Sequence, residues 1–257
     1  MNFRRCFALG LVFITFALQG CTISEITGSN LQKDPEKRIE VGLQAATAYL
    51  KGNDIENALR HLKKVLELDP KNAEAHQTMA LIYTKENDLQ KAESYYQKAI
   101  KYDEKLSSAR NNYATLLYSL GRYEAAIEQL KVASEDLSYD NRAQAVQNLG
   151  LSYNKLGQTD NAEASFQTAL RLNPKLAQSL LELTDILLQR KQYKLAGRYL
   201  NEYASITRHT ARSLWLGIQI ERAVGDENAL ARYELSLRKL FSKSGEYKQY
   251  METKPHD

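Results

Sequence analysis

The chain has 257 residues, and its composition favours helices: it contains only 4 Pro and 12 Gly. The formal net charge is +4 and falls to +2 if Arg4 and Arg5 are removed with the first 20 residues. So balanced a charge gives no reason to expect nucleic acid, which usually binds a clustered basic surface. Cys6 lies in the same removable segment, so Cys21 is the only other cysteine, and a disulfide framework or a cysteine-rich metal site is excluded.

Residues 1–20 have the form of a secretory signal peptide. A basic start precedes an apolar run over residues 7–18. A run of about a dozen apolar residues is too short to span a membrane but suits a cleaved signal. The run ends in Leu18-Gln19-Gly20-Cys21, which resembles the lipobox of bacterial lipoproteins: an aliphatic, a tolerated and a small residue, then the lipidated cysteine.

The lipobox resemblance implies a diacylglycerol thioether on Cys21 and, in Gram-negative bacteria, an acylated amino group. Two or three acyl chains anchor firmly where one holds only marginally. Thr22 stands where an Asp would be the usual inner-membrane retention signal, so the resemblance implies the periplasmic face of the outer membrane. Residues 21–36 are expected to form a lipidated polar tether. The alternative is an ordinary cleaved signal that ends beside a cysteine.

The rest of the chain is a repeat. Five alanines recur at spacings of 34, 34, 36 and 34 residues: Ala58, Ala92, Ala126, Ala162 and Ala196. A large apolar residue follows each alanine by four positions, and another packing residue follows by seven. Because spacings of three and four share one face of a helix, these positions predict a buried stripe.

A second stripe precedes each of these alanines. A small residue stands twelve positions before it in most repeats, and an aromatic residue or Leu stands nine before it. These residues are Ala46, Ala80, Ala114, Gly150 and Thr184, then Tyr49, Tyr83, Leu117, Tyr153 and Leu187. Short polar turns such as Gly52-Asn53-Asp54 lie between the stripes, and Pro70 and Pro174 end hairpins because proline does not continue a helix.

This pattern resembles the tetratricopeptide repeat. The resemblance implies an all-α, right-handed superhelical solenoid of about six helical hairpins over residues 37–245, followed by a C-terminal tail over 246–257. The repeats are expected near 39–72, 73–106, 107–142, 143–176 and 177–210, with a degenerate sixth over 211–241. A loosened last repeat is expected because terminal repeats cap a solenoid. The alternative is an unrelated helical bundle with chance alanines.

Catalytic chemistry is not predicted. The four histidines have no partner at metal-ligand spacing, and the chain contains no zinc-protease, nucleophile-elbow or glycine-rich phosphate motif. We therefore expect no enzyme activity, metal, cofactor or small-molecule substrate. Among the 16 tyrosines, Tyr49, Tyr83, Tyr96 and Tyr153 occupy repeat positions that fill the core, whereas Tyr118 points to the inner surface.

The inner surface is the predicted binding site. In tetratricopeptide superhelices the first helix of each hairpin lines a concave groove, and amides and hydroxyls interleaved with apolar residues suit a peptide. The residues at these positions are Leu43, Gln44, Thr47, Leu50, Lys51, Gln77, Leu81, Thr84, Asn111, Asn112, Thr115 and Tyr118. Gln147, Asn148, Leu151 and Asn154 continue the surface in the fourth repeat. The alternative is a solvated groove without a ligand.

The combination of lipobox, tether and about six repeats resembles the type IV pilus biogenesis lipoproteins of the PilF/PilW type, the pilotins. Two C-terminal sequence segments also resemble that family: Leu214-Trp215-Leu216-Gly217 and Phe241-Ser242-Lys243-Ser244-Gly245-Glu246-Tyr247. The resemblance implies an outer-membrane adaptor that binds secretin subunits of the type IV pilus and promotes their insertion and multimerisation. The alternative is a repeat lipoprotein serving another envelope client, such as β-barrel assembly or peptidoglycan hydrolases.

Overall fold

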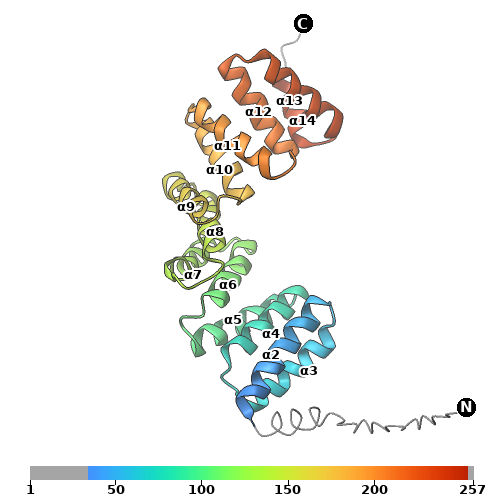
Figure 1. Cartoon of the computed structure of the whole chain (residues 1–257), viewed down its shortest axis with the longest axis vertical. Coiled ribbons are helices and arrows are strands. Elements are labelled where there is room, and N and C mark those ends of the chain that lie inside the picture. Colours follow the sequence, from blue (N-terminus) through green and yellow to red (C-terminus); the bar gives the residue numbers. More distant parts are fainter. Residues whose placement is uncertain (1–33, 254–257) are drawn as a thin grey trace, which may run out of the picture.

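The computed structural model describes residues 34–253, so the predicted signal peptide and Cys21 lie outside the described residues. The described residues form six helical hairpins and one further helix, stacked along the long axis of the molecule (Figure 1). The first helices of the hairpins are α2 (Pro35–Lys51), α4 (Ala73–Lys85), α6 (Ser107–Ser119), α8 (Arg142–Lys155), α10 (Ala177–Gln189) and α12 (Ala211–Val224).

The second helices are α3 (Ile55–Leu68), α5 (Leu89–Tyr102), α7 (Tyr123–Glu135), α9 (Thr159–Leu172), α11 (Tyr193–Ile206) and α13 (Glu227–Leu240). Helix α14 (Gly245–Thr253) follows and contacts α12. The all-α solenoid is therefore confirmed, and residues 34–253 contain no strand. None of these helices is both long and apolar enough to cross a membrane. The segment assigned to a tail, 246–257, instead begins with α14, whose Tyr250 is buried against the last hairpin.

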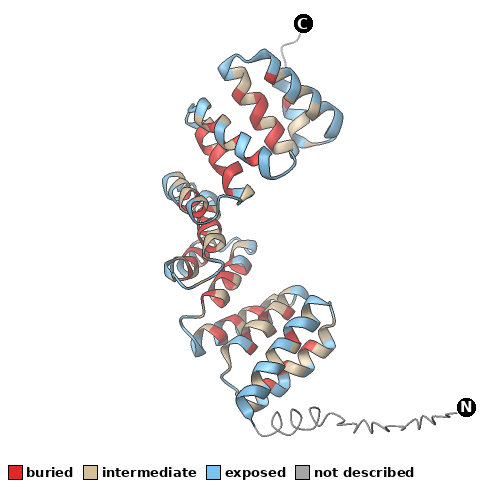
Figure 2. Cartoon of the chain, in the orientation of Figure 1, coloured by how far each residue is buried: buried red, intermediate tan, exposed pale blue. Residues whose placement is uncertain are grey.

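The repeat positions fill the core as the spacing predicts. Each of the five key alanines is fully buried, and so are the small residues twelve positions earlier. Buried residues follow the faces on which helices pack, whereas the outer faces are exposed (Figure 2). At Gly150 the two helices of a hairpin approach closely, because a Cβ there would lie 2.7 Å from the Phe166 ring.

Every hairpin turns through one residue with a positive φ, between 60° and 85°. These residues recur at the repeat spacing: Asn53, Asn87, Gly121, Gly157, Lys191 and Gly225. Gly and Asn adopt this left-handed conformation at little cost, which explains their use in five of the turns. Lys191 is the exception among the described hairpins.

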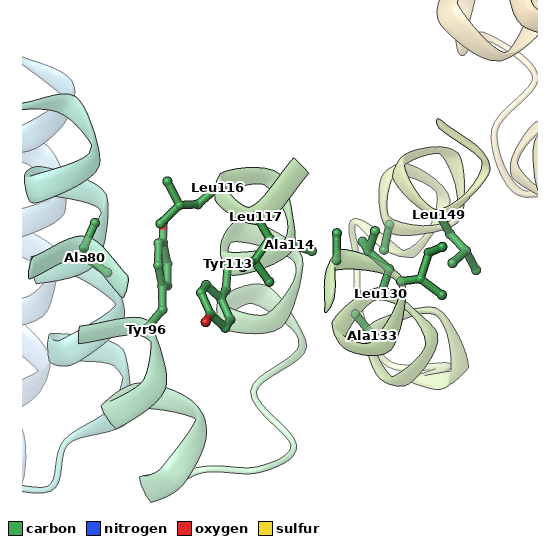
Figure 3. Close-up of a cluster of buried hydrophobic side chains, with 13 residues drawn as sticks. Ala80, Tyr96, Tyr113, Ala114, Leu116, Leu117, Leu130, Ala133 and Leu149 are labelled. Atoms are coloured by element: carbon green, nitrogen blue, oxygen red, sulfur yellow. The ribbon is translucent and has the colours of Figure 1, made fainter. Parts of the chain in front are cut away.

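The core is divided into clusters: three join neighbouring hairpins, and the last joins α12 and α13 with α14. One of them runs from α4 to α8, and in it the Tyr96 ring lies between Ala80 and Tyr113 (Figure 3). Tyr96 also stacks on Tyr113 with ring centroids 5.7 Å apart. Because each hairpin buries its apolar surface only against its neighbours, the stability of the solenoid is expected to be a sum of local terms.

One core prediction is wrong. Tyr49 is 37% exposed and stacks on the His61 ring at 5.4 Å instead of filling the core. The equivalent Tyr83 and Tyr153 are half-buried because each packs against the clusters on both sides of it. In the described chain no hairpin precedes α2, so Tyr49 has no such neighbour.

Candidate protein-binding surface

The first helices line the inner side of the stack. Contacts join α2 with α4, α4 with α6, α6 with α8, and α10 with α12, whereas second helices make at most weak contacts with one another among residues 34–253. A stack whose first helices are closest together curves around them. The predicted groove residues lie on α2, α4 and α6, the helices that line this side of the stack.

On α2 the predicted residues divide into two kinds. Leu43 and Leu50 are half-buried and pack against the first apolar cluster. Gln44, Thr47 and Lys51 are exposed, and the Gln44 side-chain amide donates to the Glu40 carboxylate at 3.1 Å. This helix offers a polar surface with apolar edges.

On the next hairpins, polar groove residues bind one another. Ser108 Oγ on α6 donates to Gln77 Oε1 on α4 at 2.8 Å, and Asn148 Nδ2 on α8 donates to Asn111 Oδ1 on α6 at 3.0 Å. Asn111 is only 7% exposed. Its amide therefore holds α6 against α8 and is not presented to a ligand.

The same arrangement continues beyond α8. Ser179 Oγ on α10 donates to Gln147 Oε1 on α8 at 3.0 Å, and both side chains are buried. We call these three hydrogen bonds, Gln77–Ser108, Asn111–Asn148 and Gln147–Ser179, the polar ladder. They fix the register of neighbouring first helices, because the buried amide oxygens of Asn111 and Gln147 need their donors.

Two predicted hydroxyls bind their own helices. Thr84 Oγ1 donates to the Ala80 carbonyl at 2.8 Å, and Thr115 Oγ1 donates to the Asn111 carbonyl at 3.0 Å. Leu81 and Asn112 are half-buried. The groups left to contact a ligand are therefore fewer than the sequence positions suggest.

Tyr118 is half-buried on α6, and its ring meets the edge of Tyr123 with centroids 5.2 Å apart. Burial raises the pKa of the Tyr118 phenol, and the charges of Tyr123 and of Glu182 on α10 raise this pKa further. The phenol therefore stays neutral at physiological pH. It offers an apolar ring and a neutral hydroxyl to a ligand.

The groove also contains a buried ion pair that sequence reasoning missed. Glu182 on α10 is buried, and Arg212 on α12 donates to both of its oxygens, at 2.7 and 2.9 Å. Arg212 also donates to Asp185 at 2.7 Å, and these bonds raise the pKa of its guanidinium. Gln178 and Asn154 donate to Glu182 as well. Glu182 and Arg212 are 30 residues apart, close to one repeat, but the repeat pattern does not by itself show that their side chains meet.

The surface offers binding groups and no metal centre. Residues 34–253 contain no group of three His, Cys, Asp or Glu side chains placed to hold a metal ion. His76 is buried, and its Nε2 lies 3.0 Å from the Pro70 carbonyl. A rigid stack with a mixed apolar and amide concave face is the arrangement of a tetratricopeptide protein-interaction scaffold.

Comparisons with known proteins agree with this class and narrow it. Tetratricopeptide-repeat family profiles match residues 46–86, 83–149 and 143–176. The type IV pilus assembly protein PilF of Pseudomonas aeruginosa is 32% identical over 246 residues, which cover 95% of this chain and 98% of PilF. The chain therefore belongs to the PilF family of type IV pilus biogenesis proteins, as its sequence resemblance predicts.

Solved structures show the same relationship. The structure of Pseudomonas aeruginosa PilF superposes with a TM-score of 0.81 at 32% identity, covering 86% of this chain and 99% of that one. PilW, described as a widely conserved type IV pilus biogenesis factor, superposes with a TM-score of 0.69 at 27% identity, covering 83% and 98%.

Proposed function

We propose that this chain is an outer-membrane lipoprotein, anchored through Cys21, that binds secretin subunits of the type IV pilus and promotes their assembly. The observation that carries the proposal is the 32% identity with the type IV pilus assembly protein PilF over nearly its full length. The lipobox-like Leu18-Gln19-Gly20-Cys21 supports the anchor. In this role the protein is an adaptor and not an enzyme.

The concave surface of the first three hairpins is the proposed secretin site. Leu43, Leu50, Leu81 and Tyr118 provide apolar contacts that a partner's side chains can cover. The exposed amide of Gln44 and the half-buried amide of Asn112 provide hydrogen bonds for a peptide backbone. The polar ladder fixes α4 and α6, which carry Leu81, Asn112 and Tyr118, before the partner arrives, and this lowers the entropic cost of binding.

Groove variants test the secretin site. Leu43→Ala, Leu81→Ala and Tyr118→Ala, made separately, are expected to reduce the yield of secretin multimers on gels. Truncating a well-packed anchor typically costs at least about 2 kcal/mol of binding, or roughly thirty-fold in affinity. Leu137→Ala is the matched control, because Leu137 is 82% exposed outside the groove. Normal multimers with all three folded groove variants would contradict the proposed site.

Membrane fractionation tests the anchor. Cys21→Ser is expected to remove the protein from the outer-membrane fraction while its circular dichroism stays unchanged, because Cys21 lies outside the repeat core. A variant that remains in the outer-membrane fraction would show that the anchor lies elsewhere.

A further inference from the structure

A second depression lies at the other end of the concave face. A hollow of about 990 Å³ is bounded by α10, α12 and α14, and its apolar walls are Leu188, Trp215 and Leu216. Beside it, a recess of about 520 Å³ lies between the start of α11 and the end of α12. Lys191, Tyr193 and Ala223 line both. The two hollows therefore adjoin at these residues, and we call the pair the C-terminal groove.

The smaller recess is strongly cationic. Lys191, Lys194 and Arg198 line it together with apolar residues, and no carboxylate does. All three cations are exposed, and within residues 34–253 none of them forms an ion pair. An unpaired set of like charges beside an apolar hollow favours a partner of opposite charge.

The charges of the larger hollow are mostly compensated within the protein. Arg212 pairs with Glu182 and Asp185. Arg222 pairs with Glu234 at 3.1 Å and lies over the Tyr250 ring. Glu246 adds one more carboxylate to the wall. What the larger hollow offers a ligand is therefore chiefly apolar surface, with the side-chain amides of Gln219 and Gln249.

The backbone of Lys191 supports a role for its side chain. Lys191 has a φ of 60° in the turn where the other described hairpins have Asn or Gly. A side chain in the left-handed region costs conformational free energy, and such strain is concentrated at functional sites. The same turn places the lysine at the junction of the two hollows.

We propose that the C-terminal groove binds an acidic segment of a partner protein that carries a large apolar side chain. The apolar side chain enters the larger hollow beside Trp215, and the carboxylates of the segment meet Lys191, Lys194 and Arg198. Side-chain amides in the hollow hydrogen-bond the peptide backbone. This site is separate from the proposed secretin surface on α2, α4 and α6, so each can fail without the other.

Trp215 provides the assay, because it is the only tryptophan of the chain and lines the hollow. The full mature chain, purified in detergent, is titrated with the synthetic peptide Asp-Glu-Phe-Leu-Glu-Asp while tryptophan emission is recorded. We expect a saturable change that weakens as salt is added. Lys-Lys-Phe-Leu-Lys-Lys and Asp-Glu-Ser-Ser-Glu-Asp, which lack the charge or the apolar pair, are expected to bind far more weakly.

A charge reversal locates the site. The double variant Lys194→Glu, Arg198→Glu is expected to lower the affinity for the acidic peptide at least about tenfold, because two attractive charges become repulsive. Lys63→Glu, Lys64→Glu on α3 makes the same net charge change at exposed positions and should bind normally. If the first variant does not fold, the salt dependence of the unmodified chain serves as the test.

Four outcomes would overturn the proposal. The first is a Trp215 emission that does not change with the acidic peptide, and the second is an affinity for this peptide that does not depend on salt. The third is that the Lys194→Glu, Arg198→Glu variant binds the acidic peptide as tightly as the unmodified chain does. The fourth is that Asp-Glu-Ser-Ser-Glu-Asp binds as tightly as Asp-Glu-Phe-Leu-Glu-Asp. A fifth is self-association: if sedimentation shows that the unmodified chain pairs with a second copy and the reversed variant does not, the groove is occupied by this chain itself.

Discussion

The two ends of the solenoid share one scaffold but have different inner surfaces. Across α2, α4 and α6 the repeat pattern is regular, the turns use Asn or Gly, and hydroxyls and amides bind their own or the next helix. Across α10 and α12 the pattern loosens, and there the groove has a buried ion pair, an exposed lysine in a strained turn and the only tryptophan.

The comparison shows where a repeat protein acquires a distinctive surface. Positions that face the partner helix of the same hairpin are constrained by packing and keep the pattern in both halves. Positions on the concave side are free of that constraint. Departures such as Glu182 and Trp215 therefore weaken the repeat signature without weakening the core.

The largest expected effect comes from breaking the buried ion pair at the C-terminal end. Arg212→Ala leaves the Glu182 carboxylate buried without its cation, and we expect a loss of about 3 kcal/mol, the low end of the usual range because Arg212 is partly exposed. Urea unfolding followed by circular dichroism measures it.

Two further variants sharpen this result. Arg122→Ala breaks the more exposed pair with Glu93 in the regular half and should cost no more than about 1 kcal/mol. Adding Glu182→Leu to Arg212→Ala should recover most of the loss, because an apolar side chain needs no counter-ion. Equal losses for Arg212→Ala and Arg122→Ala would contradict the special role of the C-terminal pair.

Overpacking tests whether the two halves share a scaffold. Ala126→Leu in the regular half and Ala196→Leu in the loosened half each insert a branched side chain at a fully buried helix crossing. Each is expected to lower the free energy of unfolding by about 1–3 kcal/mol. The exposed Ala164→Leu on α9 is the control and should stay within about 0.5 kcal/mol. Unchanged thermal stability of Ala126→Leu would mean that the repeat register is wrong.

The polar ladder separates structural from ligand-facing amides in the regular half. Asn148→Ala removes the donor to the buried Asn111 oxygen and should cost about 1 kcal/mol of stability. Asn112→Ala on the same helix as Asn111 should leave thermal stability nearly unchanged and reduce secretin multimers instead. The reverse pattern would show that Asn148, and not Asn112, faces the ligand.

The smallest effect concerns the strained turn. Lys191→Gly removes the cost of the left-handed conformation but raises the conformational entropy of the unfolded chain. We therefore expect the free energy of unfolding to rise by about 0.5 kcal/mol, measured by thermal unfolding. The reciprocal Gly157→Lys should destabilise by about 1 kcal/mol. A loss of stability in Lys191→Gly would show that the lysine side chain contributes to packing.

The sequence alone determined the class of protein and the positions of its core. Alanines such as Ala58 and Ala162 recur at the repeat spacing and are fully buried, because packing inside a hairpin depends on helical periodicity within a short stretch of chain. The C-terminal segments around Trp215 and Tyr247 indicated the family to which PilF belongs. The anchor at Cys21 and the outer-membrane location stay predictions.

Only the tertiary structure decided which groove residues are available and what they contact. The repeat pattern predicts Asn111 in the groove, but its side chain bonds to Asn148, 37 residues away. Arg212 likewise pairs with Glu182, 30 residues away in the sequence. These contacts depend on how far each hairpin is rotated against the next, a property that no single repeat encodes. The exposure of Tyr49 and the helix α14 likewise depend on which neighbours are present at the ends of the stack.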